Sequence, residues 1–203
     1  MPTRRCFTAL LLALSVAATL GATQHPFSGY SYSIAPSGIY PDTGGGELTD
    51  GIANGPAWPA PVVLADVDYL VGWQTTLPTI TFTFASAVTI NSVSAFFADS
   101  DTGAGVSLPA TVTIGDAASF SQVFAVTNPA GSGTTVESVF NGFSITTQTL
   151  TLSFTLGTAQ QWTMLSEVQA FGTAAVPEPA SSGLALGAAA LGLVATRRRR
   201  KGI

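Results

Sequence analysis

The sequence has very few of the residues from which most catalytic and metal sites are built. Of its 203 residues one is a cysteine, Cys6, and one is a histidine, His25. With a single cysteine, an internal disulfide and a thiolate metal site are both excluded. With a single histidine, placed beside the N-terminal leader in what we expect to be a mobile segment, a Ser-His-Asp or Cys-His catalytic arrangement is not expected.

Basic residues are also missing from the centre of the chain. All seven Lys and Arg residues lie in the two terminal segments, whereas residues 23–175 contain ten acidic residues and have a formal charge of −10. This stretch has no cations to neutralise phosphates, so nucleic acid is not an expected partner. It would tolerate a bound metal cation.

Residues 1–22 have the organisation of a secretory signal peptide. Arg4 and Arg5 precede an apolar stretch from Phe7 to Leu20, and Gly21-Ala22 supplies small residues for cleavage. We therefore expect export through the Sec translocon and removal of the segment by signal peptidase. An uncleaved anchor helix is the alternative, for which the apolar stretch is short.

Residues 176–203 contain three blocks in a fixed order. Val176, Pro177, Glu178 and Pro179 precede an apolar stretch from Ala180 to Thr196, which as a transmembrane helix would rise about 26 Å. The chain then closes with a basic cluster that we interpret as a membrane stop on the cytoplasmic side, so the domain would lie outside the inner membrane. The cluster consists of Arg197, Arg198, Arg199, Arg200 and Lys201.

The order of these blocks resembles the PEP-CTERM sorting signal. The resemblance implies that residues 176–179 are recognised by exosortase, a membrane peptidase, and that the tail is then removed. The inner membrane would hold a processing intermediate, and the mature protein would reach the cell surface or extracellular matrix. An ordinary stop-transfer anchor is the alternative, although such an anchor does not need the Pro-Glu-Pro triplet.

The central residues 23–175 alternate polar and apolar side chains over short segments that are separated by Gly, Pro, Asn and Asp turns. Roughly eight strands, each with one apolar face, predict an all-β fold, a single antiparallel β-sandwich of two packed sheets. Residues 35–62, rich in Gly and Pro, are expected to form a long loop. The expected strands cover residues 79–84, 88–97, 111–114, 120–126, 136–140, 143–147, 149–156 and 165–171.

Three short motifs give the domain a second resemblance. Leu48-Thr-Asp-Gly51 is followed by Val71-Gly-Trp73, and the last strand runs from Trp162 to Gly172 through Ser-Glu-Val. Together they resemble the galactose-binding-like, or discoidin-type, jelly roll, a fold that implies sugar binding. The penultimate strand, Thr149–Phe154, lacks the Arg that such domains commonly have, so an Arg-dependent ligand contact is not expected.

The resemblance also implies a structural Ca²⁺ held by Asp50 and Glu167, with carbonyls of residues 44–48 completing the shell. Glu167 supports this expectation by itself, because a carboxylate at a buried strand end in a domain without cations needs a metal or several hydrogen bonds. The alternative is that Asp50 caps its turn and Glu167 faces water.

Sugar binding needs an exposed aromatic ring beside hydrogen-bonding groups. Trp58 and Tyr69, in the early loops, are the candidates, whereas Trp73 and Trp162 are expected to pack at sheet ends. The carboxylate pairs 66/68 and 99/101 are expected to be solvated turn acids, not a glycosidase pair. The chain is thus interpreted as a non-enzymatic exported protein that binds carbohydrate or exopolysaccharide. The alternative is a structural matrix constituent without a defined ligand.

Overall fold

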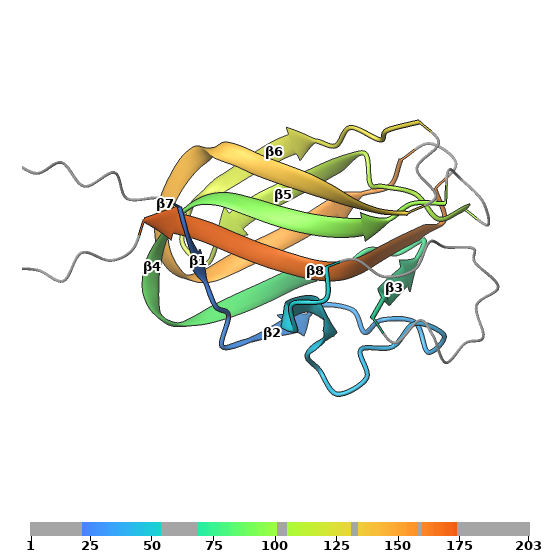
Figure 1. Ribbon diagram of the computed structural model, residues 1–203, viewed down its shortest axis with the longest axis horizontal. Helices are drawn as coiled ribbons and strands as arrows, with labels where there is room; N and C mark the ends of the chain where they lie inside the picture. The colour runs from blue at the N-terminus through green and yellow to red at the C-terminus, as the bar shows by residue number, and fades with distance from the viewer. Residues whose placement is uncertain (1–21, 54–68, 101–104, 131–133, 158–159, 174–203) are drawn as a thin grey trace, which may run out of the picture.

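The computed structural model describes residues 22–53, 69–100, 105–130, 134–157 and 160–173. These ranges form one antiparallel sheet of eight strands that folds over on itself into two layers (Figure 1). The strands are β1 (Thr23–His25), β2 (Gly29–Tyr32), β3 (Val71–Gln74), β4 (Thr79–Ala98), β5 (Thr111–Asp116), β6 (Ser121–Ala125), β7 (Thr135–Thr155) and β8 (Trp162–Thr173), with one 3-10 turn, η1 (Glu47–Thr49). The all-β sandwich expected from the sequence is confirmed.

Two long strands, β4 and β7, take part in both layers. Residues 79–83 of β4 pair with residues 149–153 of β7 in the first layer, and residues 88–98 pair with residues 135–147 in the second. A register shift between Thr83 and Val88 marks the bend. The sequence analysis predicted separate strands on either side of each bend, ending one strand before residues 85–87 and another before residue 148. The structure continues the ladder through them by way of irregular pairing.

The remaining strands complete the two layers. In the first layer β2 pairs with β4 at one side, while β5 and then β6 follow β7 at the other. In the second layer β8 pairs with β4, and β1 and β3 pair with the far edge of β8. β1, β2 and β3 were not predicted, since each has only three or four residues and falls below the length at which alternation is detectable.

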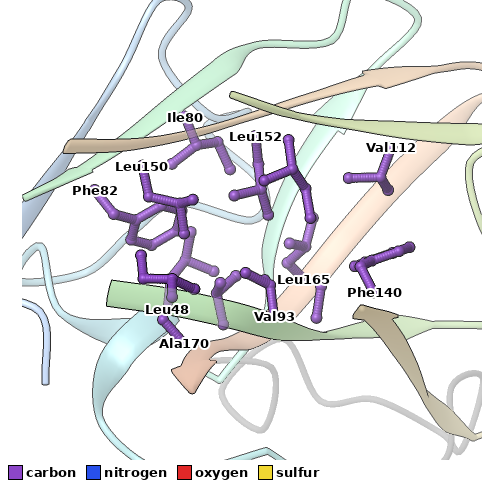
Figure 2. Packing of buried hydrophobic residues seen from close by; sticks show 14 of the residues in the cluster. Leu48, Ile80, Phe82, Val93, Val112, Phe140, Leu150, Leu152, Leu165 and Ala170 are labelled. Atoms are coloured by element: carbon purple, nitrogen blue, oxygen red, sulfur yellow. The ribbon is translucent and has the colours of Figure 1, made fainter. Parts of the chain in front are cut away.

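The core lies between the layers and follows the predicted alternation. Ile80, Phe82 and Phe84 point inward from β4, whereas Thr79 before them and Thr83 between the two phenylalanines are exposed. Figure 2 shows inward side chains of both layers meeting, with Leu150 and Leu152 of β7 near Ile80 and Phe82. Burying each such side chain contributes about 1.5–3 kcal/mol, so the domain needs no disulfide to hold its core.

The sandwich has two open sides, and different groups close them. On the side formed by β2, β1 and β3, here the loop side, residues 33–53 run along the edge and bury Leu48 of η1 in the core. On the side formed by β6 and the first part of β7, here the phenylalanine side, the closing groups are side chains. Phe124 of β6 lies 5.5 Å from Phe140 and 5.9 Å from Phe143, centroid to centroid.

Candidate functional site

The candidate site is on the loop side, along the part of β8 that neither β1 nor β3 covers. β3 pairs with residues 162–165 of β8 and β1 pairs with residues 170–172, which leaves residues 166–169 between them, Ser166 and Glu167 included. Loop residues fill this gap. Ser166 Oγ donates to the Ala53 carbonyl at 2.8 Å, and the Gly51 N–H donates to Glu167 Oε2 at 3.2 Å. Figure 1 shows this loop, with η1, beside β2 and β8.

Glu167 is a buried acid. Its side chain is 2% exposed, which contradicts the alternative that it faces water. Burial raises the pKa of Glu167 from 4.5 to about 7, and the nearby charge of Asp50 adds to the rise. Hydrogen bonds from the Gly51 N–H and the Gln169 side chain oppose it. No Lys or Arg exists between residues 23 and 175 to neutralise this carboxylate.

Asp50 is exposed and stands directly after η1. Its Oδ1 accepts a hydrogen bond from the Ile52 N–H at 2.8 Å, so it caps the turn that brings the chain back to β8. Gly51 has a φ of +88°, a backbone conformation that residues other than glycine rarely adopt, and this conformation lets its N–H point at Glu167. The structure thus brings Asp50 and Glu167 together from the two ends of the domain.

The donor set fits a hard cation in kind. The Asp50 and Glu167 carboxylates repel one another, and neither is paired with a base. Carboxylate oxygens are ligands of the type that Ca²⁺ prefers. Within the described residues no group of three His, Cys, Asp or Glu side chains converges, so further ligands would have to be carbonyls or water. The Gly46 carbonyl is engaged by the N–H and the hydroxyl of Thr49.

A second polar cluster beside this site was missed by the sequence analysis. Tyr32 Oη donates to Asp42 Oδ2 at 2.5 Å, and the Leu48 N–H donates to Tyr30 Oη at 3.2 Å. Burial raises the pKa of Tyr30 to about 12 and that of Tyr32 further still, so both phenols stay protonated. This cluster ties the loop to β2. The Tyr-Ser-Tyr spacing, which places both rings on one face of a strand, was the available signal.

The aromatic candidates divide between the described and undescribed residues. Trp58 lies outside the described residues. Tyr69 is half-buried, its pKa is raised by burial, and it packs on a small cluster that contains Leu70 and Met164. Trp73 is buried and its Nε1 donates to the Ile34 carbonyl at 3.0 Å, and Trp162 packs edge-on against Tyr40 at 5.3 Å. These last two pack within the fold, as expected.

Two sequence expectations about polar residues were wrong. Asp99, which directly follows β4, is fully buried and is not a solvated turn acid, because the chain there stays against the sheet: the Asp99 N–H donates to the Thr134 carbonyl at 3.1 Å. His25 is not in a mobile segment: it pairs with Ala170 as the last residue of β1, and it is 9% exposed. The partner acids 66, 68 and 101 lie outside the described residues.

Comparison with protein families identifies the C-terminal segment. Residues 175–201 match the PEP-CTERM protein-sorting motif. The triplet Pro177-Glu178-Pro179 and the basic cluster fall inside this match. They lie outside the described residues, and so do residues 1–21 of the leader expected at 1–22. Within the described ranges, no helix has the length and hydropathy of a membrane span. A comparison with curated protein sequences finds no match.

Comparison with solved structures concerns the sandwich. The lectin binding domain of lectinolysin, as a mutant complexed with Lewis b, matches with a TM-score of 0.51 and 12% identity over 76% of this chain and 99% of that one. The family 32 carbohydrate-binding module (CBM) of C. perfringens NanJ, in complex with galactose, matches with a TM-score of 0.49 and 11% identity over 74% and 99%. Truncated AlyQ with CBM32 and alginate lyase domains matches with a TM-score of 0.49 and 20% identity over 76% of this chain. The match covers 34% of the AlyQ chain.

These similarities concern the fold alone. The lectin domain shares with this chain the two-layered antiparallel sandwich, at an identity too low to transfer a ligand. The chain therefore combines a two-layered antiparallel β-sandwich with a PEP-CTERM sorting motif that follows it directly.

Proposed function

We propose that this protein is exported, processed by exosortase and delivered to the cell surface or extracellular matrix, where its sandwich binds carbohydrate or exopolysaccharide. The observation that carries the proposal is the order of the two parts. The last strand ends at Thr173, and the sorting motif begins at residue 175. A module with the fold of a lectin domain is thus placed directly before a signal for delivery outside the cytoplasm.

The charge of the domain restricts the polysaccharide. At a formal charge of −10 without Lys or Arg, residues 23–175 would repel a polyanionic glycan, except where a divalent cation bridges the two. A neutral glycan suits this surface better. Trp58 and Tyr69 are the proposed contacts, because an aromatic ring stacks on the apolar face of a neutral sugar.

A structural Ca²⁺ at Asp50 and Glu167 is part of the proposal. The ion would replace the missing basic partner of Glu167 and would hold residues 50–53 in the gap along β8. Oxygen ligands in addition to the two carboxylates would come from loop carbonyls and water. The proposed role of the ion is to stabilise the loop side of the sandwich, because its binding would hold the loop residues in place.

A catalytic role is not proposed. Support comes from the solved structures that share the fold, which include a lectin binding domain and carbohydrate-binding modules. Two observations on single acids also disfavour a glycosidase pair: Asp99 is buried within the fold, and Glu167 accepts a hydrogen bond from the Gly51 N–H. Hydrolysis of any sugar by the purified protein would overturn this view.

The test is a glycan array probed with the full-length chain in detergent, with Ca²⁺ and with a chelator. We expect retention on one class of neutral glycan. Trp58→Ala should lose that retention, while Trp58→Phe, which keeps an aromatic ring, should preserve most of it. Retention on no glycan would contradict the proposal and leave the structural matrix constituent as the function.

The mass of the protein recovered from the producing cell tests the delivery part separately. Loss of residues 1–22 and of the segment after the Pro-Glu-Pro triplet is the expected result. An intact chain of 20.6 kDa found in the cytosol would contradict export.

A further inference from the structure

Strand β6 is an unprotected edge of the sheet. Its five residues pair with β5 through five consecutive positions, from Thr111–Ala125 to Gly115–Ser121, without a register shift. In the described part of the chain, nothing pairs with its other edge. Its sequence, Ser-Gln-Val-Phe-Ala, has no charge and no proline. A regular strand of this kind presents unpaired N–H and C=O groups to any second strand.

The other short edge strands are protected. β1 and β2 have only three and four residues. β3 is covered by the loop, since the Gly72 N–H donates to the Tyr40 carbonyl at 3.1 Å and the Ser37 N–H donates to the Gly72 carbonyl at 2.8 Å. Short length and a covering loop are two of the ways in which proteins prevent edge pairing.

The edge formed by the first part of β7 is protected differently. It has a charged residue, Glu137, and an irregularity in which the register shifts between Asn141 and Ile145. Gly142 within it has a φ of +84°, which bends the strand. Charge and a bulge both disfavour a neighbouring strand. Among the edges of the described sheet, β6 therefore stands out as the one without a protective feature.

The side chains of β6 favour an apolar, uncharged neighbour. Val123 is 63% exposed, more than any other large hydrophobic residue of the described ranges. Phe124 points inward onto Phe140 and Phe143 and fixes the strand against the core. The acid that precedes β6 in the chain, Asp116, is engaged by three N–H groups of its own turn, those of Ala118, Ser119 and Phe120.

We infer that β6 pairs antiparallel with β6 of a second copy of this chain. In an antiparallel pair of identical strands centred on Val123, each exposed valine lies beside its own counterpart, and no charged residue of either strand faces the other. Elsewhere two domains of formal charge −10 repel one another, so an uncharged strand is where copies can approach. Because the contact is the same on both sides, it closes as a dimer with a two-fold axis and does not propagate as a fibre.

The dimer is a weak one. Five residues of edge pairing cover much less than the roughly 800 Å² per partner of a standard stable interface, so the dimer forms at high local concentration, as on a surface or in a matrix. Salt strengthens it by screening the repulsion. β6 stands at the opposite end of the strand order from β1 and β8, so the Glu167 site stays free. Two copies held together would engage a polymer with higher avidity than one.

Sedimentation of the full-length chain in detergent, over a range of protein and salt concentrations, tests the inference. The variants are Val123→Lys, which places a charge on the edge, and Val139→Lys as the matched control. Val139 is 54% exposed on β7, and its replacement changes the net charge equally. Wild type and Val139→Lys should dimerise, more tightly at high salt, and Val123→Lys should raise the dissociation constant by about tenfold or more.

Hydrogen exchange of the wild type supplies a readout that does not depend on the variant folding. Amides of residues 121–125 should gain protection as protein concentration rises, while those of β5 should not change. A monomer at every concentration would overturn the inference. So would dimers of equal strength in all three proteins, because these would arise from the tail or another surface. Neither result bears on sugar retention, which the array measures independently.

Discussion

The two open sides of the sandwich are closed by different chemistry. On the loop side a backbone segment covers the edge, and its N–H and carbonyl groups bind polar side chains. Gly51 binds Glu167, Ala53 binds Ser166, and Leu48 binds Tyr30. On the phenylalanine side, Phe120 and Phe124 face Phe140 and Phe143, and their contacts are ring against ring. Both arrangements exclude water from the same core.

The difference explains where ion chemistry can occur. A carboxylate can be buried only where fixed donors or a cation compensate it. On the loop side a backbone N–H donates to a buried acid, so Glu167 can be 2% exposed there, whereas the phenylalanine side is closed by contacts between aromatic rings. The loop side is therefore suited to binding an ion or a polar ligand, and the phenylalanine side to apolar contact along its strand edge.

The largest expected effect comes from removing the apolar residue that closes the loop side. Leu48 is fully buried and lies beside Ala170 in the core (Figure 2). Leu48→Ala should lower the free energy of unfolding by about 2–5 kcal/mol, measured by urea denaturation, because it leaves a cavity where the layers meet. Ile52→Ala, in the same loop but 50% exposed, is the control and should change it by less than about 0.5 kcal/mol. Equal losses would mean that the loop does not close the core.

A smaller effect is expected from the corresponding change on the phenylalanine side. Phe124 is half-buried, with two ring partners. Phe124→Ala should cost about 2–3 kcal/mol, less than the 3–5 typical of a fully buried ring. Val123→Ala on the same strand should be close to neutral. If Phe124→Ala left the free energy of unfolding unchanged, the phenylalanine contacts would not close their side of the core as the loop closes the other.

The sequence predicted the core strands of the two layers better than the bends and the short edge strands. Alternation in residues 79–84 and 149–156 located the core because one residue in two is apolar on a half-buried strand. The same rule failed at the bends of β4 and β7, where the ladder continues through residues that resemble turns. Neither β1 nor β3 was predicted, although together they cover most of the free edge of β8.

The candidate site was predictable in part for the same reason. The Asp50-Gly51 turn and Glu167 were identified from a resemblance and from the lack of basic residues, and the structure places them together. The cluster of Tyr30, Tyr32 and Asp42 was missed, because its members meet only when the loop folds back on β2. Contacts between a loop and a distant strand leave no periodic pattern in the sequence.

The smallest of these effects is a gain of stability, and it tests whether the loop side holds a strained acid. The pKa of Glu167 is about 7 in the folded protein against 4.5 for an ordinary glutamate, so folding favours the protonated form. The stability that Glu167 contributes is therefore fully present below pH 4.5 and is lost as the pH rises through about 7. Glu167→Gln, which keeps the shape and an acceptor for Gly51, removes this loss.

In a chelator, Glu167→Gln should be more stable than the wild type by about 1–2 kcal/mol at pH 8, allowing for water near the exposed loop, and equal to it near pH 4. Thermal unfolding across this pH range measures the difference. Added Ca²⁺ should raise the melting temperature of the wild type at pH 8 and have little effect on the variant, because the ion needs the ionised carboxylate. A pH-independent difference would show that the carboxylate is not the origin of the effect, and an equal Ca²⁺ response in both proteins would place the ion elsewhere.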